Sequence, residues 1–285
     1  MRLASTPDGR LHAVHEGRLV DVTDVLGLDP GAAGALRDLL ERGGGIDELR
    51  GLDLAALPAR PLAGAALAAP VLRPGKVVGA PVNYLDHQAE MGAQHTIADY
   101  GVFLKAPSSV SGPAEPVRLP YLDVPTHQEG ELGVVIGRTA TGVPADRALD
   151  HVFGYVPLLD ITVRSTEDRS TRKSFPTFTP TGPWVTTADE VGDPGALELR
   201  CWVDGELRQH ASTADLVYGV AELVAYASHV MTLDPGDVIA TGTPAGVGPL
   251  RGGQRVVLEI ERLGRLEVSV TDAGAIPYAR RPGAR

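Results

Sequence analysis

Three acidic residues lie within or beside apolar segments whose pattern predicts β-strands. Glu129 and Glu131 stand two positions apart before the apolar run 134–136, and Asp160 stands inside the apolar segment 154–162. Alternate side chains of a strand share one face, so both glutamates are predicted to point the same way. A buried carboxylate needs a cation. Three converging carboxylates are typical of a site for Mg²⁺, Mn²⁺ or Ca²⁺ rather than Zn²⁺.

The same acids have simpler interpretations. Two acids at alternate positions of a strand usually form its solvent-exposed face. Asp160 lies between Leu159 and Ile161, which leave it little water, but Lys173 or an arginine could be the partner that it needs. The residues alone therefore leave a metal site and a structural ion pair both open.

A histidine and a glutamate three positions apart form a second candidate. His87 and Glu90 occur in Asn83-Tyr-Leu-Asp-His-Gln-Ala-Glu90. On a helix they would share a face, and Glu90 could orient the imidazole as a general base. A surface contact is the alternative. Residues 91–100, which follow, could be a mobile lid or a plain loop.

Two lysines and one glycine-containing loop could bind negative charge. Lys105 ends an apolar strand and Lys173 precedes Ser-Phe; each is either an ordinary charge partner or a group that offsets oxyanion charge near the acids. The loop 240–248 could bind a carboxylate or phosphate through backbone N–H groups and hydroxyls, or could be a simple turn. Its candidate residues are Thr241, Gly242 and Thr243.

Composition limits the classes of function. The 285 residues include 26 Lys and Arg against 36 Asp and Glu, a formal net charge of −10. This charge argues against general nucleic-acid binding and against docking on anionic membranes. The longest stretch of low charge, 52–72, is too interrupted by proline to span a bilayer. A small anionic substrate remains possible where cations gather locally, and the candidates are Lys105, Arg164, Arg169, Arg172 and Lys173.

Several other features predict a cytoplasmic protein without the common catalytic motifs. Cys201 is the one cysteine, so no intrachain disulfide can form, and its alternating surroundings predict a buried structural thiol. The first ten residues lack the apolar segment of a signal peptide. The sequence has no Walker, Gly-x-Gly-x-x-Gly, Cys-x-x-Cys, His-Glu-x-x-His or Gly-x-Ser-x-Gly motif, so nucleotide, zinc and serine-hydrolase functions have no support.

The pattern of elements predicts a mixed α/β protein that is mostly β. Residues 1–72 are expected to form a small N-terminal domain and connector, with a hairpin at 11–23 and a helix at 29–42. Residues 73–285 are expected to form a catalytic domain with one clear helix at 213–231. Its expected strands are 76–79, 101–105, 131–137, 154–162, 184–187, 198–203, 237–241, 255–260 and 264–270.

Taken in order, these motifs resemble the fumarylacetoacetate hydrolase family over about residues 75 to 270. The matching series includes Asn83-Tyr-x-x-His-x-x-Glu90, Glu129-x-Glu131, Asp160, Lys173-Ser-Phe and Thr241-Gly-Thr-Pro-x-Gly-Val-Gly248. The resemblance implies a rolled, mixed β-sandwich catalytic domain with a small N-terminal α+β domain, usually in a homodimer. It also implies Mg²⁺ or Mn²⁺ held by Glu129, Glu131 and Asp160.

The resemblance also implies roles for other residues. His87 with Glu90 would activate water on a closing lid, Lys173 and Thr243 would belong to the metal and substrate shell, and Arg164 would bind substrate. The chain departs from the family pattern around the third acid and the second lysine, which bears on substrate identity. Leu159 and Thr162 replace the usual Asn and Ser, and Arg172 and Pro176 replace the usual Gly and Asp.

The expected function is cleavage of a C–C bond in an acylpyruvate, a 2-oxo acid, by a divalent-metal-dependent hydrolase. The metal would chelate the 2-oxo oxygen and its neighbouring carboxylate while His87 deprotonates a water. Oxaloacetate-type decarboxylation, and isomerisation or hydration of unsaturated 2-oxo-diacids in aromatic catabolism, are alternatives with the same enolate chemistry. A catalytically silent binding protein on this fold is the rival from another class.

Overall fold

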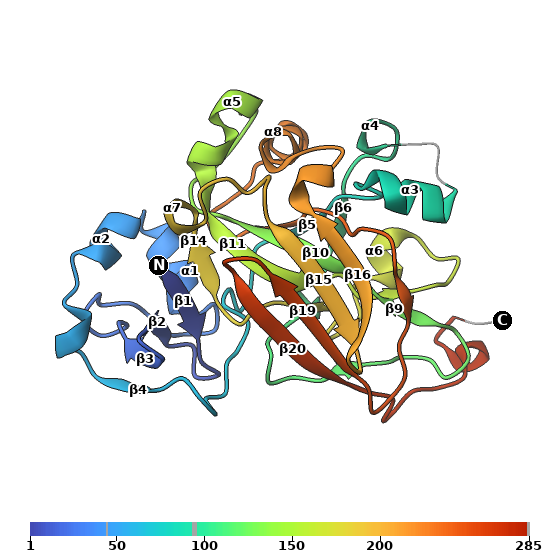
Figure 1. Cartoon of the computed structure of the whole chain (residues 1–285), viewed down its shortest axis with the longest axis horizontal. Coiled ribbons are helices and arrows are strands. Elements are labelled where there is room, and N and C mark those ends of the chain that lie inside the picture. Colours follow the sequence, from blue (N-terminus) through green and yellow to red (C-terminus); the bar gives the residue numbers. More distant parts are fainter. Residues whose placement is uncertain (44, 93–95, 284–285) are drawn as a thin grey trace.

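The computed structural model describes the whole chain except residues 44, 93–95 and 284–285, and it is built around a ten-stranded sheet (Figure 1). The strand order is β4-β3-β2-β1-β14-β11-β10-β17-β5-β6, and β17 and β5 are parallel. The bounds are β1 Arg2–Ser5, β2 Leu11–His15, β3 Arg18–Asp21, β4 Ala59–Pro61, β5 Val77–Gly79, β6 Phe103–Lys105, β10 Gly130–Ile136, β11 Val152–Leu159, β14 Val185–Thr187 and β17 Val238–Ala240.

A five-stranded sheet packs against the large one. Its order is β16-β15-β19-β20-β8, and its side chains share one core cluster with β10 and β11. The two packed sheets confirm the predicted strand-rich, mixed α/β class. The bounds are β8 Val117–Arg118, β15 Glu198–Val203, β16 Glu206–Ser212, β19 Arg255–Ile260 and β20 Gly264–Thr271.

The central strands β10 and β11 are buried along their whole length. Val134 packs into the core between the two sheets, whereas its neighbour Val135 packs into a second core on the opposite face. Both faces are therefore apolar, which explains why these segments read as continuous hydrophobic runs. Acids placed at the ends of these strands are consequently held away from water.

The first strands of the chain continue the main sheet. Leu3 of β1 lies opposite Val185 of β14, so β1–β4 extend a sheet whose other strands come from later in the sequence. The predicted hairpin is present as β2 and β3. Helices α1 (Ala35–Glu41) and α2 (Ile46–Arg50) add side chains to the core on this face of the sheet. The domain boundary near residue 72 remains a prediction.

Two predicted helices are shorter than expected. The helix expected at 29–42 begins only at Ala35, because Gly34, with φ of 84°, occupies its N-cap. The helix expected at 213–231 is α8 (Val220–Val230), since the preceding residues form a 3₁₀ turn and bond to Asn83. Strand β16 was missed because its exposed, polar residues give no clear alternation.

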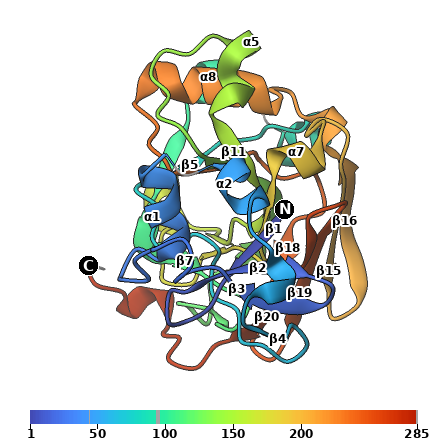
Figure 2. The same cartoon turned by 90° about the vertical axis from the view of Figure 1, so that its left-hand side faces the viewer.

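Shorter elements complete the structure. A small sheet of order β12-β9-β18 adjoins one end of β10, and β7 pairs with β13. Figure 2 shows α5 and α8 together at one end of the molecule. The bounds are α3 Leu85–Met91, α4 Ile97–Tyr100, α5 Ala145–Ala148, α6 Arg169–Arg172, α7 Ala188–Val191, β7 Val110–Ser111, β9 Thr126–Gln128, β12 Thr162–Val163, β13 Thr179–Pro180 and β18 Gly248–Pro249. Among the described residues, the helices are all too short and polar to cross a bilayer.

Candidate active site and metal centre

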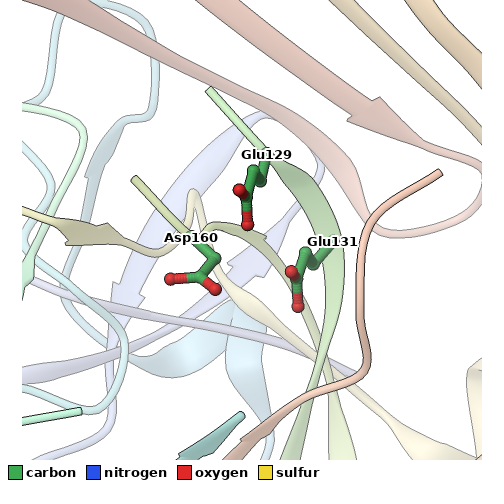
Figure 3. A group of neighbouring side chains, drawn as sticks. All are labelled: Glu129, Glu131 and Asp160. Atoms are coloured by element: carbon green, nitrogen blue, oxygen red, sulfur yellow. The ribbon is translucent and has the colours of Figure 1, made fainter. Parts of the chain in front are cut away.

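The three acids singled out from the sequence converge. Figure 3 shows the carboxylates of Glu129, Glu131 and Asp160 turned toward one another, and one oxygen from each lies within 4.8 Å of the others. Their exposed fractions are only 4%, 2% and 1%. The predicted site is therefore an enclosed cluster of oxygen donors and not a solvent-exposed strand face.

The convergence follows from where the chain changes sheets. Glu129 lies between β9 of the small sheet and β10 of the large one, while Asp160 lies between β11 and β12. Because Gly130 pairs with Leu159, the residues just beyond them also meet, and the Asp160 N–H donates to the Glu129 carbonyl at 2.8 Å. The strand predicted over 154–162 thus ends one residue before its acid.

The donor set fits Mg²⁺ or Mn²⁺. Two oxygens bound to one such ion at about 2.1 Å lie at most about 4.2 Å apart, close to the spacing of this cluster. Glu131 accepts a hydrogen bond from the Gly242 N–H at 2.8 Å, and no ion pair to it is found among the described side chains. A buried carboxylate without a cationic partner needs one, and a divalent ion held by the three acids would supply it.

Two buried lysines support the cluster. Lys173 Nζ donates to Glu129 Oε2 at 2.6 Å, to Asp160 Oδ2 at 2.5 Å and to the Thr162 hydroxyl at 2.7 Å. Lys105 Nζ donates to Asp160 Oδ1 at 2.5 Å and to a backbone carbonyl at 2.7 Å. Each carboxylate oxygen of Asp160 therefore accepts from one lysine. The structural ion pair considered as an alternative is present, and the same acid also belongs to the cluster that could hold a metal.

The pKa values of the two glutamates shift in opposite directions. Burial would raise the pKa of Glu129, but Lys173 and Arg164 outweigh it and lower that pKa to about 2. Arg164 donates to Glu129 Oε1 at 2.9 Å. Burial, reinforced by Asp160, raises the pKa of Glu131 well above its ordinary value. The difference reflects which carboxylate has cations within contact distance.

The predicted His87–Glu90 pair is present on helix α3. His87 Nδ1 lies 2.8 Å from Glu90 Oε2, and His87 lines the same cavity as the three acids. Because the carboxylate accepts, Nδ1 carries the proton, which leaves Nε2 as the nitrogen able to take another. The geometry suits a general base.

Helix α3 is held by contacts at both ends. Asn83 Nδ2 donates to the carbonyls of Tyr218 and Thr241 at 2.9 and 2.8 Å just before the helix, and Glu90 Oε1 accepts from the Gly246 N–H at 3.0 Å. These bonds dock α3 on the loop that follows β17. The lid expected over 91–100 remains a prediction, and residues 93–95 lie outside the described part of the chain.

The backbone of the loop 240–248 requires glycine at position 242. Gly242 has φ of 98°, and a Cβ atom there would lie 2.7 Å from that of Asn83. Thr243 donates its hydroxyl to the Gly130 carbonyl and accepts from Gln209 Nε2 at 2.7 Å. Thr241 donates to the Leu132 carbonyl at 3.0 Å. The loop is thus fastened to β10 beside the acids.

The cavity at this site has a volume of about 70 Å³. Among the predicted site residues it is lined by His87, Glu129, Glu131, Asp160, Arg164, Lys173 and Thr243. Three predicted substrate contacts lie behind this wall: Lys105 and Thr241 form hydrogen bonds within the protein, and Gly242 supports Glu131. Positions behind the lining favour a supporting role for these three residues.

Sequence reasoning gave no role to several polar residues that shape the site. Asn83 anchors α3, Gln209 reaches across from β16 to Thr243, and Thr162 accepts from Lys173. Asn83 stood in the motif with His87, so its position was a usable signal. Gln209 had none, because it lies in the strand that was missed.

Similarity to known proteins agrees with this geometry. A family model described as "Fumarylacetoacetate (FAA) hydrolase C-terminal" matches residues 76–271. A maleylpyruvate hydrolase of Aquipseudomonas alcaligenes is 44% identical over 220 aligned residues, and the match covers 73% of this chain and 77% of the relative. This chain belongs to the fumarylacetoacetate hydrolase family.

Two solved structures extend the likeness to nearly the whole chain. A maleylpyruvate hydrolase from Sphingobium sp. SYK-6, in complex with manganese(II) and pyruvate, has a TM-score of 0.86 and 41% identity, covering 95% of this chain and 99% of its own. A 2-hydroxyhepta-2,4-diene-1,7-dioate isomerase from Mycobacterium marinum has a TM-score of 0.77 and 33% identity, covering 96% and 99%. The family therefore includes relatives named for hydrolysis and for isomerisation.

Proposed function

We propose that this protein is a divalent-metal-dependent hydrolase that cleaves an acylpyruvate into a carboxylic acid and pyruvate. The observation that carries the proposal is the buried cluster of Glu129, Glu131 and Asp160 with His87 lining the same cavity. The manganese and pyruvate in the Sphingobium relative support both the metal and the product.

Bound Mg²⁺ or Mn²⁺, held by the three acids, supplies a Lewis acid for the 2-oxo oxygen and its neighbouring carboxylate. His87 Nε2 takes a proton from the attacking water, and Glu90 on Nδ1 orients the ring and stabilises its charged form. The water oxygen bonds to the distal acyl carbon, the C–C bond breaks, and its electron pair leaves on pyruvate as the enolate. Protonation of that enolate completes the reaction.

The other lining residues hold the components in place. Lys173 holds Glu129 and Asp160 together and adds positive charge beside the developing enolate. Arg164 lies at the cavity wall and is available to a substrate carboxylate besides Glu129. The cavity of about 70 Å³ is small for such a substrate, so we expect the walls to separate when substrate enters.

The deciding experiment is pyruvate release from an acylpyruvate by metal-stripped protein, with and without added Mn²⁺ or Mg²⁺. We expect release only with metal, accompanied by a higher melting temperature. Pyruvate release that does not respond to metal would contradict the assigned site. A metal-dependent rise in melting temperature without pyruvate would keep the site but contradict hydrolysis.

Isomerisation of an unsaturated 2-oxo-diacid is the second candidate, because the Mycobacterium marinum relative carries an isomerase name. Both reactions pass through an enolate, so the triad alone does not separate them. Ultraviolet spectra of a 2-hydroxy-diene-dioate mixed with the enzyme would show its conversion. Carbon dioxide release from oxaloacetate tests decarboxylation, and failure of all these assays would favour a silent binding protein.

We also propose a cytoplasmic homodimer divided near residue 72 into a small N-terminal domain and a catalytic domain. The family resemblance supports the dimer, and the single cysteine is compatible with a reducing compartment. Light scattering after size-exclusion chromatography tests the dimer, since a monomeric mass would contradict it.

A further inference from the structure

One turn of helix presents three cations to the site. Helix α6 carries Arg169 and Arg172, and Lys173 follows directly as its C-cap. Residues at positions i, i+3 and i+4 share a helical face, and all three line the cavity that contains the acids. Lys173 reaches the carboxylates, which leaves the two arginines on the remaining part of the wall.

The charges around the acids are already balanced without these arginines. The three carboxylates are matched in number by three cationic side chains, those of Lys105, Lys173 and Arg164, which contact Glu129 and Asp160. Arg169 and Arg172 are additional, and so is the divalent ion of the proposed function. The cavity therefore has an excess of positive charge that a ligand with more than one negative charge would neutralise.

Neither arginine has a carboxylate partner among the described residues. Arg172 makes one long hydrogen bond, from Nη1 to the Ser165 carbonyl at 3.4 Å, and its buried Nε has no partner there. Arg169 lies over the ring of Tyr100, with Cζ 4.6 Å from the ring centre. Asp168, the nearest acid in the sequence, instead caps α6 by accepting from Ser170 and Thr171.

The environment of Arg172 is unfavourable for an unpaired guanidinium. Burial lowers the pKa of Arg172, and the neighbouring guanidiniums of Arg164 and Arg169 lower it further, although Glu129 and Asp160 oppose them. An arginine stays protonated in proteins, so the shift expresses a cost of keeping this charge without a partner. An anionic group bound at its planar fork would remove that cost.

We propose that Arg172, with Arg169 beside it, binds a second carboxylate on the acyl part of the substrate, so that the enzyme prefers dianionic acylpyruvates. This inference rests on the proposed function for the reaction that is catalysed. It adds the residue that binds the second negative charge of the substrate. The pyruvyl carboxylate goes to the metal side of the cavity, and the distal carboxylate goes to the α6 side. A neutral acyl chain would leave the Arg172 fork unpaired.

The test compares two substrates that differ only at the far end of the acyl chain. Succinylpyruvate ends in a carboxylate, and butanoylpyruvate ends in a methyl group at the same position. We expect the wild-type enzyme with Mn²⁺ to prefer succinylpyruvate by at least about tenfold in kcat/KM, since a site built for a polar group rejects the analogue that lacks it. Arg172→Gln should lose most of this preference.

Matched variants distinguish a loss of substrate preference from a general loss of folded, active enzyme. Arg172→Gln should change kcat/KM for butanoylpyruvate by less than about threefold, because only the charged substrate loses a contact. Arg172→Lys should retain part of the preference, and Arg138→Gln, at an exposed arginine that does not line the cavity, should retain all of it. Equal losses on both substrates would mean that Arg172 acts through Lys173, which would overturn the proposal.

A binding measurement keeps the inference testable if hydrolysis fails. The Kd values of 2-oxoglutarate and 2-oxopentanoate, again a carboxylate against a methyl group, are measured by calorimetry with the Mn²⁺-loaded protein and with Arg172→Gln. A preference for 2-oxoglutarate that disappears in the variant supports the proposal even without turnover. Equal affinities in the wild type, or a preference that survives the substitution, would refute it.

Discussion

The apolar layer beneath α1 and the junction around Asp160 are both buried against the main sheet, but by different means. Beneath α1, Leu3, Leu36 and Val135 pack through apolar contact alone. At the junction, Asp160 accepts from two lysines, one of them 55 residues away in the sequence. Apolar burial needs only the right periodicity, whereas burial of charge needs particular partners. The first region should therefore govern stability, and the second should govern metal binding and activity.

The substitution with the largest expected effect on activity is Glu131→Gln, in the junction around Asp160. The amide keeps the shape and can still accept from Gly242, but it removes the negative charge that a divalent ion needs. We expect kcat/KM to fall by about 10³-fold or more, since a catalytic metal contributes several kcal/mol. The rise in melting temperature on adding Mn²⁺ should also be lost. Glu48→Gln, on the exposed surface, is the control, and full activity of Glu131→Gln would refute the assigned ligand.

A second test separates the base from the metal centre. His87→Gln should lower kcat/KM by about 10²- to 10⁴-fold, the usual contribution of a general base. Glu90→Gln should cost about tenfold to a hundredfold, as for other residues that orient a functional side chain. Both variants should bind Mn²⁺ as the wild type does, measured by calorimetry. Loss of Mn²⁺ binding in His87→Gln would indicate that His87 is a metal ligand and would contradict its assignment as a general base alone.

A third test addresses the layer beneath α1. Leu36 is fully buried there, so Leu36→Ala should lower the free energy of unfolding by about 2–5 kcal/mol in a urea titration. Below the unfolding transition its kcat/KM should match the wild type. Leu207→Ala, where the side chain is 48% exposed, should be nearly neutral. A large loss of activity in folded Leu36→Ala would show that the two regions are coupled.

The smallest effect concerns a titratable group on β2, on the face of the sheet opposite the layer beneath α1. Burial lowers the pKa of His12 below its ordinary value of 6.5, even though Asp21 lies 3.8 Å away and opposes the shift. The unfolded chain therefore binds this proton at higher pH than the folded one, so stability should fall as pH drops below about 6.5. His12→Gln should weaken this pH dependence of the unfolding free energy. An unchanged slope would mean that other groups cause it.

Local patterns predicted much of the candidate site. The i, i+2 spacing of Glu129 and Glu131 and the i, i+3 spacing of His87 and Glu90 follow from strand and helix geometry, and the structure brings each pair together. The order of motifs was specific enough to indicate the family, which the match over residues 76–271 confirms. The roles assigned to these residues remain predictions for the experiments above.

Other features depended on contacts between distant segments. The sequence showed Lys105 as an apolar strand end, but only the sheet order places it against Asp160. Strand β16 could not be predicted from the sequence, because an edge strand with mostly exposed polar residues lacks the alternating apolar pattern of a half-buried strand. The pairing of β1 with β14 was equally hidden, since Leu3 and Val185 are 182 positions apart in the sequence.

By itself, the sequence determined the strand-rich class, the three acids, the histidine–glutamate pair and the excess of negative charge on the whole chain. These properties depend on residue type and short-range spacing, which backbone geometry converts directly into shared faces. Only the tertiary structure decided which lysine contacts which carboxylate, and that Arg172 lines the cavity with no carboxylate partner among the described residues. Such contacts arise where the chain passes between sheets, and their energy depends on burial and distance that no short segment contains.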